Sequence, residues 1–162
     1  PVQTLGEEVD DEKAQAIRKF LSGLLEQMES AAEIHIYLLE KGRYKVILEG
    51  KKLGALIGRR GETLDALQYL VSLYANHGRQ EYQRITLDTE GYRARREETL
   101  ARLARKEAAQ VRSTGRSVTL EPMNPYERRI LHSALQDFDG VATYSEGEEP
   151  SRCVIIAPKQ DD

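Results

Sequence analysis

Apolar side chains recur along the first half of this 162-residue chain with two spacings, one typical of helices and one of strands. In residues 11–30 the apolar positions lie three or four apart, which is the period of an amphipathic helix. Residues 34–40 and 43–49 are strand-like, and the second of these runs alternates strictly. Because Lys41-Gly42 separates them, we expect the two strands to form a hairpin.

A short apolar stretch over residues 53–57 predicts a second helix, and a tight glycine turn follows it. Residues 61–76 are so rich in leucine, valine and tyrosine that we expect a nearly buried helix. Residues 82–88 alternate again and predict a strand. The predicted order is therefore helix, strand, strand, helix, turn, helix, strand.

The second half of the chain begins with a long predicted helix over residues 91–111, with apolar positions on one face and basic ones on another. Residues 118–120 predict a short strand. Asn124-Pro125 is a helix start, because Asn caps the free N–H groups and Pro fits the first helical position. This helix is expected to end near Asp137, and an acidic turn over residues 146–150 then joins two short strands.

These patterns predict an α+β protein made of two small tandem domains. The expected divisions are a tail or linker over residues 1–10, a first domain over 11–89, a second over 90–158 and a tail over 159–162. Hydrophobic residues make up 40% and charged residues 31%, which fits globular domains with modest cores. No apolar run approaches the ~18 residues that a membrane span needs.

Charge is distributed unevenly along the chain, although the net charge is only −3. Residues 51–132 carry 16 basic and 10 acidic side chains, whereas the segments before and after them are acidic. A basic centre of this kind is a footprint for a polyanion, and a mixed solvated surface is the competing interpretation.

The most informative motif is Gly58-Arg59-Arg60-Gly61, between two apolar helical patterns. Glycine lets the backbone adopt positive φ and approach a ligand closely, and arginine supplies forked donors for phosphate. The free N–H groups of the following helix favour phosphate as well. We therefore expect this turn to contact a sugar-phosphate backbone, with Ile57 and Leu64 positioning it.

A second candidate site lies on the helix that follows Asn124. Arg128 and His132 are four residues apart and so project from one helix face. Together they could hold one phosphate or one base, and Arg129 is a plausible phosphate neighbour. Tyr126 could stack on a base or only pack on the start of the helix, and the sequence favours neither.

Both motifs resemble known nucleic-acid-binding domains. Ile57-Gly58-Arg59-Arg60-Gly61 with Leu64 resembles the KH signature, and the predicted element order matches the type II KH arrangement. The stretch from Leu120 through Arg128 and His132 to Arg152 resembles the R-three-H domain, named for an Arg and a His separated by three residues. In this order, the two domains resemble the Jag family of SpoIIIJ-associated bacterial proteins.

The resemblance implies a cytoplasmic protein that binds single-stranded nucleic acid, RNA in the first place, with a role linked to the cell envelope, division or sporulation. It also implies a membrane-protein insertase and a second KH protein as partners. A protein-interaction adaptor and a single-stranded DNA binder stay open as alternatives. Family members usually carry a further N-terminal domain and linker, which are not visible in this sequence.

The sequence gives no reason to expect an enzyme, a cofactor or a metal site. His35, His77 and His132 are scattered, and no Cys-x-x-Cys or His-x-x-x-His spacing occurs. Neither a phosphate-binding Walker loop nor a Gly-x-Ser-x-Gly motif is present. The single cysteine, Cys153, permits no internal disulfide, which fits a reducing compartment.

Overall fold

The computed structural model describes residues 6–159 and divides the chain into two compact units. The first unit ends at Arg93 and the second begins at Ala94, four residues into the stretch expected for the second domain. Each unit has its own hydrophobic core and is described by itself.

The first unit is a four-stranded sheet with three α-helices. Its strands are β1 (Glu7–Glu8), β2 (Glu33–Leu39), β3 (Arg43–Glu49) and β4 (Ile85–Thr89), in the spatial order β1-β2-β3-β4. Its α-helices are α1 (Glu12–Gln27), α2 (Gly54–Ile57) and α3 (Glu62–Asn76). β1, β2 and β3 pair antiparallel, whereas β3 and β4 are parallel and are connected through α2 and α3.

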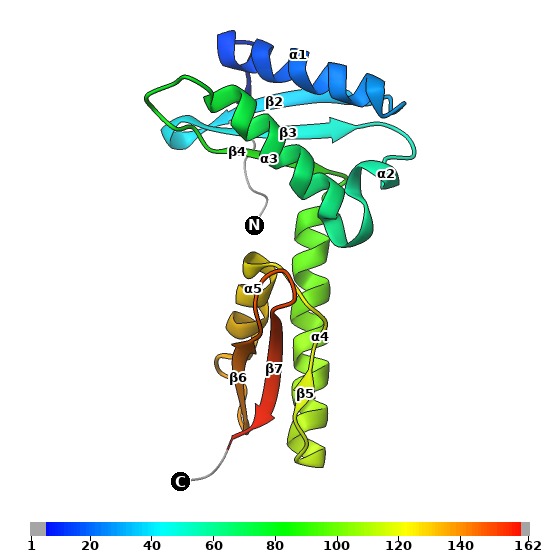
Figure 1. Ribbon diagram of the computed structural model, residues 1–162, viewed down its shortest axis with the longest axis vertical. Coiled ribbons are helices and arrows are strands. Elements are labelled where there is room, and N and C mark those ends of the chain that lie inside the picture. The colour runs from blue at the N-terminus through cyan, green and yellow to red at the C-terminus, as the bar shows by residue number, and fades with distance from the viewer. Residues whose placement is uncertain (1–5, 160–162) are drawn as a thin grey trace. The chain divides into compact units, whose positions relative to one another are not determined.

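Helices α1 and α3 lie against one face of this sheet (Figure 1). Asp11 fixes the start of α1, because its carboxylate accepts a hydrogen bond of 2.8 Å from the Ala14 N–H. The alternation predicted for residues 43–49 is confirmed, since Tyr44, Val46 and Leu48 are buried in the core. The hairpin turn is a short 3₁₀ segment, Glu40–Gly42.

Three details of the first unit differ from the sequence expectations. Within the stretch expected to be a tail or linker, Glu7 and Glu8 form a strand paired with Leu38 and Tyr37; residues 1–5 lie outside the described part. The strand expected over 82–88 begins only at Ile85. The helix expected to be nearly buried instead exposes a row of apolar side chains along α3, which are Tyr69, Leu70, Leu73 and Tyr74.

The second unit is a three-stranded antiparallel sheet with two helices. Its strands are β5 (Val118–Thr119), β6 (Val141–Glu146) and β7 (Cys153–Pro158), in the order β5-β7-β6. Its helices are α4 (Tyr92–Thr114), whose first two residues belong to the first unit, and α5 (Pro125–Leu135). The acidic turn predicted between β6 and β7 is confirmed as a hairpin connection.

One face of this sheet shares a core with both helices. Val154 and Ile156 of β7 pack with Leu131 of α5 and with Leu100 and Ala104 of α4. The predicted helix start is confirmed, because Asn124 Oδ1 accepts from the Glu127 N–H at 2.8 Å. The helix ends at Leu135, slightly earlier than expected. No helix among the described residues is long and apolar enough to cross a membrane.

Candidate nucleic-acid interface

The turn between α2 and α3 is built from left-handed backbone. Gly58 has φ 71° and ψ −174°, Arg60 has φ 55° and Gly61 has φ 77°. Arg59–Gly61 form one 3₁₀ turn, in which the Gly61 N–H donates to the Gly58 carbonyl at 3.4 Å. Three positive φ values within four residues fix this backbone in a sharp reversal.

Both glycines are required by close contacts as well as by their φ angles. A Cβ on Gly58 would lie 2.2 Å from Thr63 Oγ1, and a Cβ on Gly61 would lie 2.6 Å from the Tyr92 ring. Tyr92, at the start of α4, therefore packs directly under the turn. The sequence pattern around the turn gave no signal for this residue, because it lies about thirty positions further along the chain.

The residues expected to position the turn do so unequally. Leu64 is fully buried, as expected, whereas Ile57 is only half-buried, and the neighbouring Leu56 is the α2 side chain that is completely buried. Arg59 is exposed and Arg60 is half-buried. The turn therefore presents Arg59 to solvent on a backbone anchored by Leu56 and Leu64.

The start of α3 carries two carboxylates, which work against a phosphate at this helix end. One of them, Asp65, is paired with Arg93, whose Nη1 donates to Asp65 Oδ1 at 2.7 Å. The same guanidinium donates to the Gln68 side chain and to the Leu87 carbonyl. Arg93 thus offsets one of the two charges and ties α3 to β4, a role that its sequence position did not reveal.

In the second unit, Arg128 and His132 lie on one face of α5, as their spacing predicts, and this face is turned toward the β6–β7 hairpin. Arg128 is 8% exposed. Its guanidinium donates to both carboxylate oxygens of Glu149 and to the Met123 carbonyl. A bidentate Arg–carboxylate pair fills the donors that a phosphate would use.

His132 is bonded on both sides of its ring. Nδ1 lies 2.7 Å from Thr143 Oγ1 and Nε2 lies 2.8 Å from Ser145 Oγ, both on β6. Hydroxyl groups can donate or accept, so they satisfy a neutral imidazole. Burial, and after it the positive charge of Arg128, lower the pKa of His132 below its ordinary value. The imidazole is therefore neutral near pH 7 and links α5 to β6.

The start of α5 is held against α4 by a further ion pair. Glu127 is 6% exposed, and Arg96 Nε donates to its Oε1 at 2.8 Å. Of the residues proposed from the sequence in this helix, Arg129 is exposed, and Tyr126 is 57% exposed. The cation that this helix offers to solvent is therefore Arg129, not Arg128.

Among residues 6–159, the structure brings together one group that could hold a metal ion, although the sequence spacing showed none. Glu33, His35 and Glu49 place their ligand atoms within 4.8 Å of one another on β2 and β3. His35 Nδ1 lies 3.0 Å from Glu8 Oε1. The hydrogen bond with Glu8 is the main cause that raises the pKa of His35, which favours the protonated imidazole beside these carboxylates.

Comparison with known proteins assigns a domain to each unit. The KH domain of KhpA/KhpB matches residues 14–87, and the R-three-H domain matches residues 98–158. An RNA-binding protein KhpB of Clostridium symbiosum is 51% identical over 144 residues, which are 88% of this chain and 65% of that protein. The RNA-binding protein KhpB of Bacillus subtilis is 37% identical over 149 residues, 90% of this chain and 71% of that protein.

A third relative shows how much longer such proteins can be. The RNA-binding protein KhpB of Lactiplantibacillus plantarum is 34% identical over 159 residues, which are 97% of this chain and 49% of that protein. The chain thus spans about half to just over two thirds of the length of these relatives.

Proposed function

Since the chain belongs to the KhpB, or Jag, family of KH and R-three-H proteins, we propose that it binds single-stranded RNA through both units. The observation that carries the proposal is the turn of Gly58, Arg59, Arg60 and Gly61. Its positive φ angles and the close approach of Thr63 and Tyr92 hold it in one conformation, and Arg59 is exposed on it. A fixed basic turn clamps a nucleotide backbone at low entropic cost.

In the second unit, the proposal assigns different roles to the three residues expected there. Arg129 is exposed and contacts phosphate directly. Arg128 and His132 hold the β6–β7 hairpin against α5 through Glu149, Thr143 and Ser145. Their contribution to binding is therefore to position this hairpin.

The first experiment replaces the two arginines of the turn. We expect Arg59→Asp with Arg60→Asp to weaken binding at least tenfold, which requires only about 1.4 kcal/mol. Aspartate tolerates the left-handed backbone at position 60, so the fold should survive. The matched control is Arg43→Asp with Arg84→Asp, because both of these side chains are exposed. Arg43 begins β3, and the glycine turn follows the other end of that strand. Unchanged affinity in a folded turn variant would exclude the turn from the mechanism.

The second experiment compares strands and salt concentrations. Bases contacted beside such a turn must be unpaired, so a single-stranded RNA of roughly ten nucleotides should bind more tightly than its duplex. Each phosphate contact to a single strand contributes about −0.7 to the slope of log affinity against log salt. Equal or tighter duplex binding would contradict the proposal. Parallel titration of DNA of the same sequence tests the single-stranded DNA alternative.

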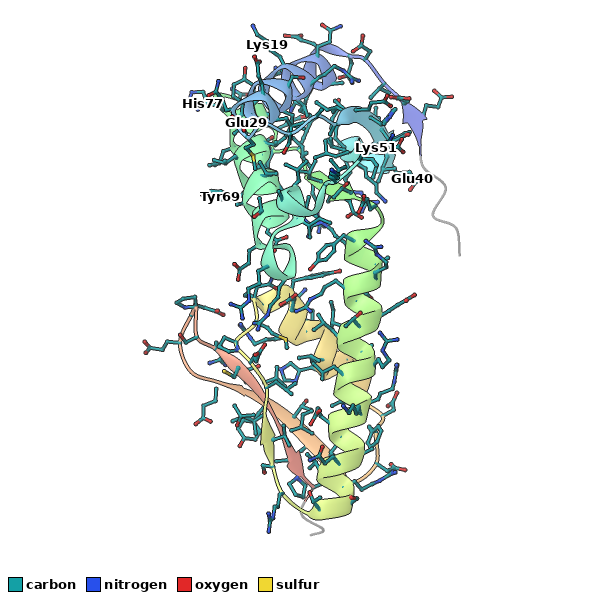
Figure 2. The ribbon with its side chains drawn as sticks, turned by 90° about the vertical axis from the view of Figure 1, so that its right-hand side faces the viewer. Lys19, Glu29, Glu40, Lys51, Tyr69 and His77 are labelled. Carbon is teal, nitrogen blue, oxygen red and sulfur yellow. The ribbon has the colours of Figure 1, made fainter. Side chains whose placement is uncertain are left out.

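A protein-interaction adaptor is a second candidate, because α3 exposes Tyr69, Leu70, Leu73 and Tyr74. Tyr69 is 65% exposed and projects outward from α3 (Figure 2). Beside this face, a groove of about 560 Å³ is lined by Leu70, Leu73 and Tyr74 and by cations of Lys13 and Arg79. Exposed apolar surface of this kind marks protein contacts.

An insertase or a second KH protein is the partner that the family resemblance suggests for such an adaptor, and a role linked to the cell envelope, division or sporulation rests on the same resemblance. A pull-down repeated after nuclease treatment separates the two candidates. An adaptor keeps its protein partners after nuclease treatment but loses them when Leu73→Asp is introduced. An RNA binder loses most of its partners after nuclease treatment.

A further inference from the structure

The solvent-facing side of α4 carries four basic residues on one face, which we call the α4 basic face: Arg95, Arg102, Arg105 and Lys106. All four are exposed, and the opposite side of the helix packs in the core through Leu100, Ala104, Ala108 and Val111. At a rise of ~1.5 Å per residue, positions 95 and 106 are about 16 Å apart along the helix. The four cations therefore form a stripe about three turns long, with a gap of two turns between Arg95 and Arg102.

These cations differ from four other arginines of the second unit, which are used within the fold. Arg96 pairs with Glu127, Arg128 pairs with Glu149, and Arg112 lies 5.1 Å from the centre of the Phe138 ring. Arg152 donates to the Gly147 and Ser145 carbonyls.

In contrast, no side chain of the α4 basic face makes an ion pair with any residue of the described range 6–159. Glu98, exposed one turn from both Arg95 and Arg102, is the acidic residue that shares their side of the helix.

Arg102 lies one turn from both Arg105 and Lys106, and like charges at this spacing repel one another, so this part of the face gains from a polyanion. A charged surface that tracks the backbone is how proteins hold single strands independently of sequence. Arginine suits this contact because its planar fork matches phosphate oxygens. Within α5 only Arg129 is an exposed cation, so the second unit needs further cations if it binds a strand.

We propose that the α4 basic face is the phosphate-binding track of the second unit, and that it binds the backbone of single-stranded RNA. The proposal rests on the RNA binding proposed above and adds a surface that neither domain motif includes. A solvated face without a ligand and a docking face for an acidic protein are the competing interpretations.

The test removes three charges from this face in the full chain. Arg95→Gln, Arg102→Gln and Lys106→Gln keep good helix formers at exposed positions, so the fold should persist. The matched control is Arg43→Gln, Arg84→Gln and Lys19→Gln, which has the same change in charge at exposed positions of the first unit; Lys19 projects from α1 (Figure 2). Binding of a fluorescent oligouridine is measured by anisotropy at several salt concentrations. The oligouridine is about 20 nucleotides long, which leaves room for more than one contact site.

We expect the α4 variant to bind at least tenfold more weakly than wild type, with a salt slope about 2 units shallower because three contacts are lost. The control variant should change affinity less than the α4 variant and should keep the wild-type slope. Glu98→Gln should raise the affinity, since it removes the carboxylate on this face. Circular dichroism establishes that each variant is folded.

Equal affinities of the α4 variant and its control would overturn this inference. If the turn variant, Arg59→Asp with Arg60→Asp, still weakened binding in that case, the proposed RNA binding would stand and only the role of α4 would fall. If wild type bound no oligouridine, both proposals would fall. Polyglutamate that bound wild type as tightly as RNA, and lost binding in the α4 variant, would assign the face to an acidic protein instead.

Discussion

The ion pair of Arg128 with Glu149 gives the sharpest prediction about the second unit. Sequence reasoning expected Arg128 to contact nucleic acid, whereas the structure uses its guanidinium to hold the β6–β7 hairpin. Arg128→Met and Glu149→Gln remove one partner each with little change in volume. Together with the double variant they form a double-mutant cycle, which isolates the coupling energy of the pair.

The size of this coupling follows from the burial of the two side chains. That of Arg128 is 9% exposed and that of Glu149 is 50% exposed. Exposed pairs contribute about 0–1 kcal/mol, and breaking a fully buried pair costs about 3–5 kcal/mol. A bidentate pair with one buried and one half-exposed partner lies between these limits, so we expect a coupling of about 2 kcal/mol. Arg128→Met should cost more than Glu149→Gln, because it also removes the bond to the Met123 carbonyl.

Native-state hydrogen exchange in the full chain measures this effect for the second unit alone. The amide of Ile156, in the central strand β7, reports opening of the core. A coupling of about 2 kcal/mol means that the double variant speeds exchange roughly 30-fold less than the product of the two single effects. The effects of independent sites on the free energy of unfolding add to within about 0.5 kcal/mol. A coupling below this value would mean that the ion pair does not stabilise the second unit. If Glu149→Gln also binds RNA more tightly, Arg128 becomes a phosphate ligand once its carboxylate is removed.

Three further predictions concern pH, the glycine turn and the start of α5. The pKa of His132 is lowered, so the second unit should lose stability as pH falls below about 6.5, the unfolded pKa. The pKa of His35 is raised, so the first unit should lose stability as pH rises above about 6.5. Hydrogen exchange of each unit, measured from about pH 5.5 to 8, should therefore show opposite trends in the two units. His132→Gln should abolish the trend in the second unit, and His35→Gln should abolish the trend in the first. Gly61→Ala should destabilise the first unit more than Gly78→Ala, which has a similar φ of 67° but open space around it, and equal denaturation midpoints would contradict the contact with Tyr92. Arg96→Leu should cost about 2 kcal/mol by leaving the Glu127 carboxylate buried without its cation, whereas Arg95→Leu beside it should leave the stability of the second unit nearly unchanged.

The sequence predicted the elements of both units well where periodicity and turn chemistry agreed. The alternation of residues 43–49 and the cap at Asn124 each follow from local physics, and both are confirmed. β1 was not predicted, because Glu7–Glu8 is a two-residue acidic strand whose pairing depends on β2 rather than on its own composition. The exposure of apolar side chains on α3 was not predicted, because apolar residues extend around more of the helix surface than the part that packs against the core.

The orientation of Arg128 could have been found from the sequence. It lies three residues before Leu131 and seven before Leu135, both of which are buried, so it shares the core stripe of α5. A motif match directs attention to the residue type, whereas the helical period decides which way the side chain points. The partner Glu149 could not have been identified, since 21 positions separate it from Arg128 and the acidic turn contains several glutamates.

The net charge of −3 also shows why overall composition is a poor guide to binding of a polyanion. At physiological ionic strength the Debye length is about 8 Å, so a phosphate senses mainly the charges near it. What matters is which cations are unpaired and exposed. Arg93, Arg96 and Arg128 are held by carboxylates within the fold, whereas Arg59, Arg129 and the α4 basic face are exposed. A chain that is acidic overall can therefore bind RNA through local basic surfaces, provided that its carboxylates lie elsewhere or are already paired.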